Sequence, residues 1–348
     1  MKNLSRINEV DLLRFIAAMM VVFFHYAFRG FMGVGDNQLT TMSYPILSSL
    51  AKYGFLGVNL FFMISGFVII LSASRGNLQK FVSSRILRLY PAFWICCSLS
   101  LFIPLVVGGG RLSWELLNTY FVNLTMLNGF VDVPSIDGVY WSLFVEIKFY
   151  LLISIVLTLG LIHKIESLMF GWLFISIIMT RFPKTEIHSM LITDWSGYFI
   201  AGVAFFWIYQ DGFNWRRVML VISSYILVMR NAFNKVYYHQ LEYQVVFRKE
   251  IIAIIITTFF IVFLLITVKR TGFLRMIEWR VLGAITYPLY LLHSGIGFVI
   301  FNKMYPEYNE HVILWGTICF MLLLSYSIHV FFERPIAIKL RSMLLMRK

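Results

Sequence analysis

The stretch NEVDLLRFIAAMMVVFFHYAFRG, residues 8–30, is long and apolar enough to cross a lipid bilayer as one helix. It nevertheless keeps Arg14 near one end and His25 near the other. Eleven residues of α-helix advance about 16 Å and turn through about 1100°, which is three full turns plus roughly 20°. The two side chains are therefore predicted to share one face of the helix. Ionisable groups at that depth usually face a bundle interior or an aqueous cavity.

The whole chain has the composition of an integral membrane protein. Of its 348 residues, 59% are hydrophobic and only 14% are charged, whereas a water-soluble domain needs a more polar surface. Apolar runs of about 20 residues, the length that crosses a bilayer, recur along the chain. The predicted fold class is all-α, a polytopic membrane protein with about ten transmembrane helices. These crossings are predicted at about residues 10–29, 54–72, 89–107, 139–161, 167–182, 196–210, 216–231, 250–268, 280–301 and 312–331.

The distribution of charge predicts the topology. Lysines and arginines gather on the side of the membrane that holds the amino terminus, which places both termini in the cytoplasm. The net charge of +13 could suggest a nucleic-acid partner, but no basic arm or nucleic-acid motif is present in the sequence. The predicted outer segments, at 30–53, 108–138, 183–195 and 232–249, are too short to fold as separate domains.

The chain is predicted to form one integral-membrane domain over residues 1–348. Its helices fall within about 10–331, and a short cytoplasmic tail follows at 332–348. The segment FFERP, residues 331–335, is predicted to mark the cytoplasmic end of the last crossing. Pro335 is expected to stop that helix, because proline lacks a backbone N–H and its ring clashes with the preceding turn.

Two arginines stand one helical turn apart in the segment SSRILRLYPAFW, residues 83–94, just ahead of the third predicted crossing. The guanidinium groups of Arg85 and Arg88 could clamp a phosphate on the inner side, since their geometry matches phosphate oxygens. Their spacing fits equally well with two ordinary charges at the edge of a membrane. Both interpretations are open on the sequence alone.

A carboxylate opens the fourth predicted crossing, in the segment GVYWSLFVEIKFYLL, residues 138–152. By helical rise, Glu146 lies roughly 9 Å and His25 roughly 6 Å below the outer surface, so their depths match. A carboxylate beside an imidazole can orient the ring and stabilise its protonated form, which is the arrangement of a supported general base. Alternatively, Glu146 pairs with a basic residue such as Lys148 or Arg29 and has no chemical role.

Two further segments carry features of interest. In GFLGVNLFFMISGFVII, residues 54–70, the glycines predict close helix packing. In ITYPLYLLHSG, residues 285–295, His293 is predicted to lie in the outer half of the membrane. An intramembrane histidine is a candidate site residue because burying an ionisable group there is costly.

Together these segments resemble the integral-membrane acyltransferase-3 family, whose members acylate hydroxyl groups of bacterial surface carbohydrates and related molecules. Arg14, ten intervening residues and then His25 form that family's most diagnostic signature. The segments GVNLFFMISGFVI, RILRLYPAFW, WSLFVEIKFY and ITYPLYLLH resemble further motifs of the family, in the same order. The resemblance covers residue 8 to about 335. Asn59 occupies a position where the family often has Asp, a mild departure.

The resemblance implies an enzyme of the bacterial cytoplasmic (inner) membrane that takes an acyl group, usually acetyl, from cytoplasmic acyl-CoA. It delivers that group to a carbohydrate hydroxyl at the outer face. The implied partners are acetyl-CoA or another acyl-CoA, a surface polysaccharide or lipid-linked glycan, and the lipid bilayer, with no metal ion. By match to the motifs, the implied residues are catalytic His25, Arg14 and Glu146; donor-binding Arg85, Arg88 and Arg14; and substrate-binding Trp141, Ser142, Tyr287 and His293.

Acyl transfer to a sugar hydroxyl needs a base, a held thioester and stabilisation of the oxyanion. His25 is the candidate base, and Arg14 would steady the donor or the oxyanion. Direct transfer and an acylated His25 are both compatible with the sequence. The competing function classes are a transporter, which also places Arg, His and Glu inside the membrane, and a non-catalytic polysaccharide-export subunit. The sequence shows no inverted repeat of the kind that many transporters carry.

Overall fold

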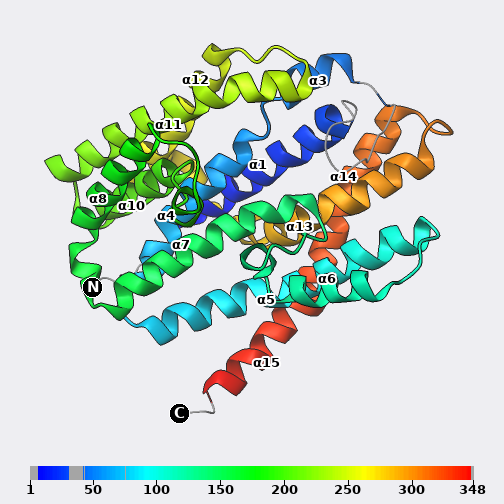
Figure 1. Ribbon diagram of the computed structural model, residues 1–348, viewed down its shortest axis with the longest axis horizontal. Coiled ribbons are helices and arrows are strands. Elements are labelled where there is room, and N and C mark those ends of the chain that lie inside the picture. Colours follow the sequence, from blue (N-terminus) through cyan, green and yellow to red (C-terminus); the bar gives the residue numbers. More distant parts are fainter. Residues whose placement is uncertain (1–6, 31–41, 43, 75, 346–348) are drawn as a thin grey trace. The chain divides into compact units, whose positions relative to one another are not determined.

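The computed structural model describes residues 7–30, 42, 44–74 and 76–345, and within these ranges all regular structure is helical (Figure 1). The predicted all-α fold class is therefore confirmed. The short elements η1 and η6 are π-helical, and the other η elements are 3-10 helices. In chain order the elements are α1 (Asn8–Phe24), η1 (His25–Arg29), α3 (Pro45–Ala51), α4 (Leu56–Ala73), α5 (Leu78–Val107), α6 (Trp114–Leu124), η2 (Asn128–Phe130), η3 (Gly138–Tyr140), α7 (Trp141–Thr158), η4 (Leu161–Lys164), α8 (Ile165–Met179), α9 (Glu186–Met190), α10 (Ser196–Asp211), α11 (Trp215–Tyr243), α12 (Lys249–Thr267), η5 (Gly272–Arg275), α13 (Arg280–Met304), α14 (Glu310–Ile328), η6 (His329–Glu333) and α15 (Arg334–Leu345).

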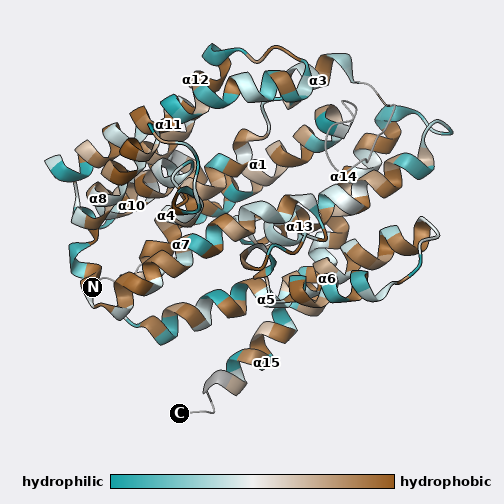
Figure 2. Cartoon of the chain, viewed as in Figure 1, coloured by the Kyte–Doolittle hydropathy of each residue, from teal (hydrophilic) through white to brown (hydrophobic). Residues whose placement is uncertain are grey.

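Eight helical stretches of the described chain are long and apolar enough to cross a membrane. Figure 2 shows the hydrophobic runs that such helices carry, for example along α7. The chain is thus a multi-pass membrane protein. The eight stretches are Asn8–Arg29, Pro45–Ala73, Leu78–Val107, Gly138–Thr158, Leu161–Met179, Lys249–Thr267, Arg280–Met304 and Glu310–Met343.

Each of the ten predicted crossings coincides with a helix in the structure. The predicted crossings at 196–210 and 216–231 correspond to α10 and α11, which lie outside the eight stretches above. Helix α10 is only 16 residues long, and α11 has 29 residues but a polar composition. The positions of the helices could therefore be predicted, while the number that crosses the bilayer depends on these two.

Helix α5 begins at Leu78, eleven residues before the predicted start at 89. The side chain of Asn77 accepts a hydrogen bond from the backbone N–H of Lys80 at 2.8 Å, which caps the first turn. The residues after this cap are helical although they are more polar than the run from 89 onward. Arg85 and Arg88 consequently lie within the helix and not in the segment before it.

All four predicted outer segments contain helix, because α3 lies within 30–53 and α9 within 183–195. Helix α11 extends to Tyr243 and fills most of the predicted segment 232–249. Helix α6 lies within the predicted segment 108–138, and its N-cap residue Ser113 accepts a hydrogen bond from the N–H of Leu116 at 3.1 Å. The predicted outer segment 30–53 is described only in part, because residues 31–41 and 43 lie outside the described ranges.

The prediction that Pro335 stops the last helix is wrong. Helix α14 continues through η6 into α15, which runs from Arg334 to Leu345. Proline within a regular α-helix removes one hydrogen bond and clashes with the carbonyl four residues earlier. Here Pro335 is the second residue after the wider π-helical turn at His329–Glu333 and the second residue of α15, where its missing N–H is tolerated.

The described chain divides into two compact units. The first holds the described residues up to Ala17 together with Leu56–Phe81 and Val145–Trp279, and the second holds Ala18–Phe55, Val82–Phe144 and the residues from Arg280 onward. Each unit is described by itself below.

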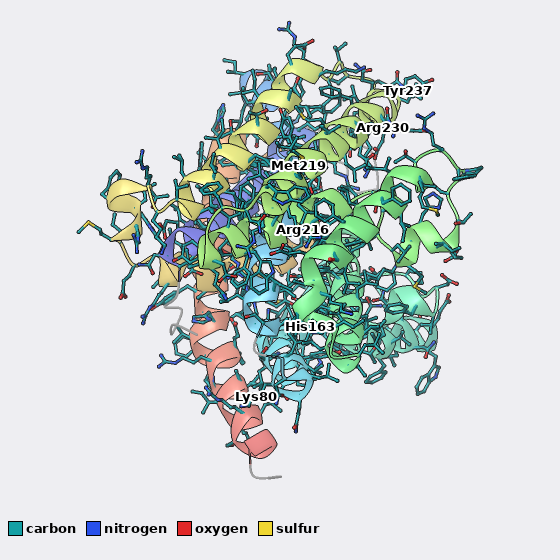
Figure 3. All side chains as sticks on the ribbon, turned by 90° about the vertical axis from the view of Figure 1, so that its left-hand side faces the viewer. Lys80, His163, Arg216, Met219, Arg230 and Tyr237 are labelled. Atoms are coloured by element: carbon teal, nitrogen blue, oxygen red, sulfur yellow. The ribbon has the colours of Figure 1, made fainter. Side chains whose placement is uncertain are left out.

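Helix α10 is the centre of the first unit and packs against α4, α8, α11 and α12. The contact with α4 is close: a Cβ at Gly66 or at Gly202 would collide with backbone atoms of the opposite helix. The helix-packing role predicted for the glycines of residues 54–70 is thus found at Gly66. Figure 3 shows Arg216, Met219, Arg230 and Tyr237 spaced along α11.

A cluster of charges lies beside α11 in the same unit. The Asp194 carboxylate is 2.7 Å from the Lys184 ammonium and 3.5 Å from the Lys235 ammonium. The Lys235 ammonium also lies 3.2 Å from the centre of the Trp195 ring. Burial lowers the pKa of Lys235 to about 8. These contacts join the segment before α10 to α11 and so have a structural role.

Helix α13 is the centre of the second unit. It packs against α14 and contacts η1, η3 and η6. Its residues from Leu289 to Phe298 are buried without interruption. His293, in the middle of this run, is fully buried, and its surroundings contain most of the candidate site residues.

Candidate active site

His25 is the first residue of the π-helical turn η1, and its side chain is 7% exposed. π-helical turns are rare and are frequently found at functional sites. The Nδ1 atom of His25 lies 2.9 Å from the carbonyl oxygen of Val21, one turn earlier, and 3.1 Å from the Nε2 atom of His293. The two imidazole rings meet edge to face, with centroids 4.8 Å apart.

The hydrogen bonds fix the protonation of both neutral rings. The Nδ1 atom of His293 lies 2.8 Å from the carbonyl oxygen of Tyr290. A carbonyl oxygen can only accept, so Nδ1 carries the proton in His293 and, for the same reason, in His25. The Nδ1–H of His25 is then shared between the Val21 carbonyl and the lone pair on Nε2 of His293. The Nε2 atom of His25 therefore retains its lone pair and can accept a proton.

Tyr26 holds α13 against η1. Its hydroxyl donates a hydrogen bond of 2.7 Å to the backbone carbonyl of His293. Gly297 makes this approach possible, because a Cβ at that position would collide with the Tyr26 ring and hydroxyl. The backbone of His293 is thus fixed by the residue that follows His25 in the sequence.

A second set of buried hydroxyls lies one turn before His293. The Ser142 hydroxyl is 2.7 Å from the Tyr290 hydroxyl, and each lies 3.2 Å from the carbonyl oxygen of Val139. These contacts join the start of α7 to α13 within the second unit. Of the predicted substrate-binding residues, Ser142 contacts α13 through the Tyr290 hydroxyl, and His293 lies within α13.

The match to a family model decides the family. The model of the acyltransferase-3 family, described as an acyltransferase domain, matches residues 7–330 of this chain. The chain belongs to the acyltransferase-3 family. This confirms the family resemblance seen in the sequence motifs.

Two relatives of this acyltransferase-3 chain are informative. Nodulation protein 10 of Rhizobium leguminosarum bv. viciae is 25% identical over 249 residues, which cover 63% of each chain. An uncharacterized protein of Haemophilus influenzae is 26% identical over 223 residues, which cover 58% of this chain and 83% of the relative. The chain thus spans less than two thirds of the length of the Rhizobium relative. No solved structure matches this chain.

The two arginines of the third family motif lie on α5 in the second unit, three residues apart and half-buried. The Nε–H of Arg85 donates to the Ser84 hydroxyl at 3.3 Å. Arg88 lies within electrostatic range of Glu333, whose carboxylate is 2.8 Å from Nδ1 of His329 in the π-helical turn η6. The two guanidinium groups thus form a half-buried pair of cations one turn apart on α5.

Arg14 and Glu146 belong to the first unit. A guanidinium nitrogen of Arg14 lies 3.6 Å from the carboxylate of Asp11, since residues three apart are neighbours on a helix surface. Glu146 accepts a hydrogen bond of 2.6 Å from the Ser65 hydroxyl. Lys148, considered as a partner for Glu146, instead donates to the Ser189 hydroxyl at 2.6 Å. The shared face of Arg14 and His25 and the pairing of Glu146 with His25 stay predictions.

The remaining predicted substrate-binding residues are Trp141 and Tyr287. Trp141 is the first residue of α7 and is 43% exposed, whereas Tyr287 lies half-buried on α13, six residues before His293. Neither is placed against the histidine pair by a hydrogen bond in the described residues. Both stay predictions.

Tyr26 was not predicted as a site residue. It stands next to the signature histidine. Gly295 and Gly297, which follow His293, are the sequence signal that could have indicated a close approach to α13. Among the described residues, no group of three or more His, Cys, Asp or Glu side chains is arranged to hold a metal ion.

Proposed function

We propose that this protein transfers an acyl group, most often acetyl, from cytoplasmic acyl-CoA to a hydroxyl of a surface or exported carbohydrate, in the bacterial cytoplasmic membrane. Membership of the acyltransferase-3 family supports the reaction type. The observation that carries the chemistry is that both hydrogen-bond contacts of His25 are made by Nδ1, which leaves the lone pair on Nε2 to act as the base. The identity of the donor and acceptor, and the direction of transfer, rest on the family resemblance.

The proposed reaction is a general-base transfer. Nε2 of His25 takes the proton from the acceptor hydroxyl while the hydroxyl oxygen attacks the thioester carbonyl carbon. The carbon–sulfur bond then breaks, and the proton passes from Nε2 to the departing CoA thiolate. Throughout, Nδ1–H of His25 stays bonded to the Val21 carbonyl and to Nε2 of His293, which stabilises the transient positive charge on the ring.

The other residues take the roles that the family motifs imply. Arg85 and Arg88 bind the phosphates of the donor, and Arg14 steadies the donor or the oxyanion. Glu146 supports the acceptor end. Trp141, Ser142 and Tyr287 contact the carbohydrate, while His293 acts as a positioning residue for His25 in addition to its predicted role in substrate binding.

The direct test uses the purified protein in liposomes with radiolabelled acetyl-CoA and candidate glycans. Label is expected in the glycan, and a His25→Asn variant, which keeps a side-chain N–H donor but no base, should transfer about 10²- to 10⁴-fold more slowly. Movement of unmodified glycan or donor across the membrane without a labelled product would support the transporter instead. Absence of both activities with donors and acceptors of the native host would support an export subunit.

A first prediction concerns His293. His293→Leu is expected to lower kcat by about 10- to 100-fold, because the Nδ1–H of His25 keeps only the Val21 carbonyl as an acceptor and the ring is held less firmly in its orientation. His293→Gln should recover part of this loss, since the amide oxygen can accept the same hydrogen bond. The measurement is kcat for labelled acetyl transfer in the two variants at equal amounts of folded protein. Equal activity of Leu and Gln variants would contradict the positioning role.

A second prediction concerns the donor. Arg88→Gln is expected to raise the KM for acyl-CoA about 10- to 100-fold with little change in kcat, since a hydrogen bond to a charged group contributes about 1.5–3 kcal/mol to binding. Lys80→Gln is the matched control, because this exposed cation lies on the same helix and outside the motif. An equal KM for both variants would remove Arg88 from the donor site.

A further inference from the structure

Asp137 is a buried carboxylate in the connection before α7, and the reaction as described does not use it. Its side chain is 6% exposed, and the preceding residues 132–136 include a proline and a serine typical of a turn. One carboxylate oxygen, Oδ1, accepts from the N–H of Val139 at 3.1 Å. This contact caps the short helix η3, which is an ordinary structural role.

The second carboxylate oxygen has a different partner. Oδ2 of Asp137 accepts a hydrogen bond of 2.9 Å from the backbone N–H of Gly295, 158 residues later in the sequence. Gly295 lies inside α13, where a backbone N–H is ordinarily directed at the carbonyl four residues earlier. A side chain can reach such an amide only where the helix surface is open. Gly295 provides that opening, because a Cβ there would lie 2.9 Å from Oδ2.

This contact and the hydroxyl contacts of Tyr290 lie on either side of His293 in the sequence of α13. Gly295 follows His293 by two residues, and Tyr290, which donates to the Val139 carbonyl, precedes it by three. Residues 137–139 therefore contact α13 on both sides of His293. Tyr26 fixes the His293 carbonyl from a third direction. These contacts to α13 set the position of the His293 ring. The His293 ring in turn accepts the hydrogen bond from Nδ1–H of His25.

We propose that Asp137 is a positioning residue of the active site, which sets α13 so that Nε2 of His293 meets Nδ1 of His25. This inference rests on the proposed function of His25 as the base. An N-cap alone would need only one carboxylate oxygen. The second oxygen has a stabilising partner on the helix that carries His293, and this is what assigns the residue to the site.

The test variant is Asp137→Asn. Both carboxylate oxygens accept from backbone N–H groups, so the amide can satisfy only one of them and its NH2 faces the other donor. The expected result is a kcat lowered about 10- to 100-fold, with the KM for acyl-CoA within about twofold of the wild-type value. The matched control is Asp132→Asn, because Asp132 is an exposed carboxylate of the same connection. This variant should leave both kcat and KM unchanged.

A second variant addresses the same contact from α13. Gly295→Ala should displace the Asp137 carboxylate and lower kcat similarly, and the double variant should be only slightly worse than the worse single variant. Gly316→Ala is its control, because a Cβ at Gly316 on α14 meets open space. If Asp137→Asn fails to fold, Gly295→Ala with this control carries the test alone.

Two readouts separate positioning from a merely structural role. In a His25→Asn background, Asp137→Asn should cause no further loss of the residual transfer. The nitrogen-15 NMR signal of the His25 Nδ1–H should also change in Asp137→Asn and not in Asp132→Asn. This signal tests the positioning even if the wild-type protein transfers no acyl group, an outcome that would refute the proposed function alone. A folded Asp137→Asn variant with wild-type kcat and an unchanged Nδ1–H signal would overturn the inference, as would a change confined to KM.

Discussion

His25→Ala is expected to lower kcat for acyl transfer by about 10²- to 10⁴-fold, the range that a positioned general base contributes. The physical reason is the loss of the Nε2 lone pair, the proton acceptor that the hydrogen bonds of Nδ1 hold in place. The KM for acyl-CoA should change little, because the donor is proposed to bind through arginines. The measurement is labelled acetyl transfer at saturating donor.

His25→Asn is the matched variant for this prediction. Its side-chain NH2 can still donate to the Val21 carbonyl or to Nε2 of His293, so the local packing between η1 and α13 is retained without a base. Both variants should therefore show the same large loss of kcat, while the His25→Asn protein should be more stable to heat than the His25→Ala protein. Turnover close to that of the wild type in either variant would remove His25 from the chemistry.

Arg14→Ala is expected to lower kcat by about 10²- to 10³-fold, the loss seen when one donor that stabilises a developing oxyanion is removed. The variant has a second effect, because Arg14 lies 3.6 Å from the carboxylate of Asp11, which is buried. Removing one partner of a buried ion pair can cost about 3–5 kcal/mol of stability. A loss of activity in this variant could therefore reflect unfolding.

The double variant Asp11→Asn, Arg14→Gln separates the two effects. It removes both charges of the pair and should recover much of the thermal stability lost in Arg14→Ala. If Arg14 acts on the donor or the oxyanion, the double variant is stable and inactive. The single variant Asp11→Asn is the control and should retain most of its activity. A stable double variant with near-normal kcat would show that Arg14 serves only the fold.

The helical architecture could be predicted because bilayer thickness imposes a length on apolar runs. The ends of the helices could not, since they depend on polar residues. Asn77 caps α5 twelve residues ahead of the predicted start of the crossing at 89, and the polar end of α11 continues to Tyr243. The π-helical turn before Pro335 shows the same limit, because a local widening of the helix allows proline where a regular turn would exclude it.

The candidate site shows a similar division. The sequence identified Arg14, His25 and His293 as candidate site residues. Ionisable side chains within apolar runs are energetically unfavourable in a membrane and are therefore often functional. The contact between His25 and His293 joins residues 268 apart in the sequence, and matching depths alone could not establish it. Asp137 gave no signal, since a single Asp in a segment with Pro and Gly has the pattern of an ordinary turn.

The central claim is that the neutral His25 ring carries its proton on Nδ1 and offers a lone pair on Nε2. The most direct measurement is nitrogen-15 NMR of histidine-labelled protein, with the His25 signals assigned by their loss in His25→Asn. The account predicts a protonated Nδ1 and an unprotonated Nε2 in the resting protein, with the Nδ1–H signal altered in His293→Leu. A proton found on Nε2, or a His25 signal indifferent to His293, would contradict it.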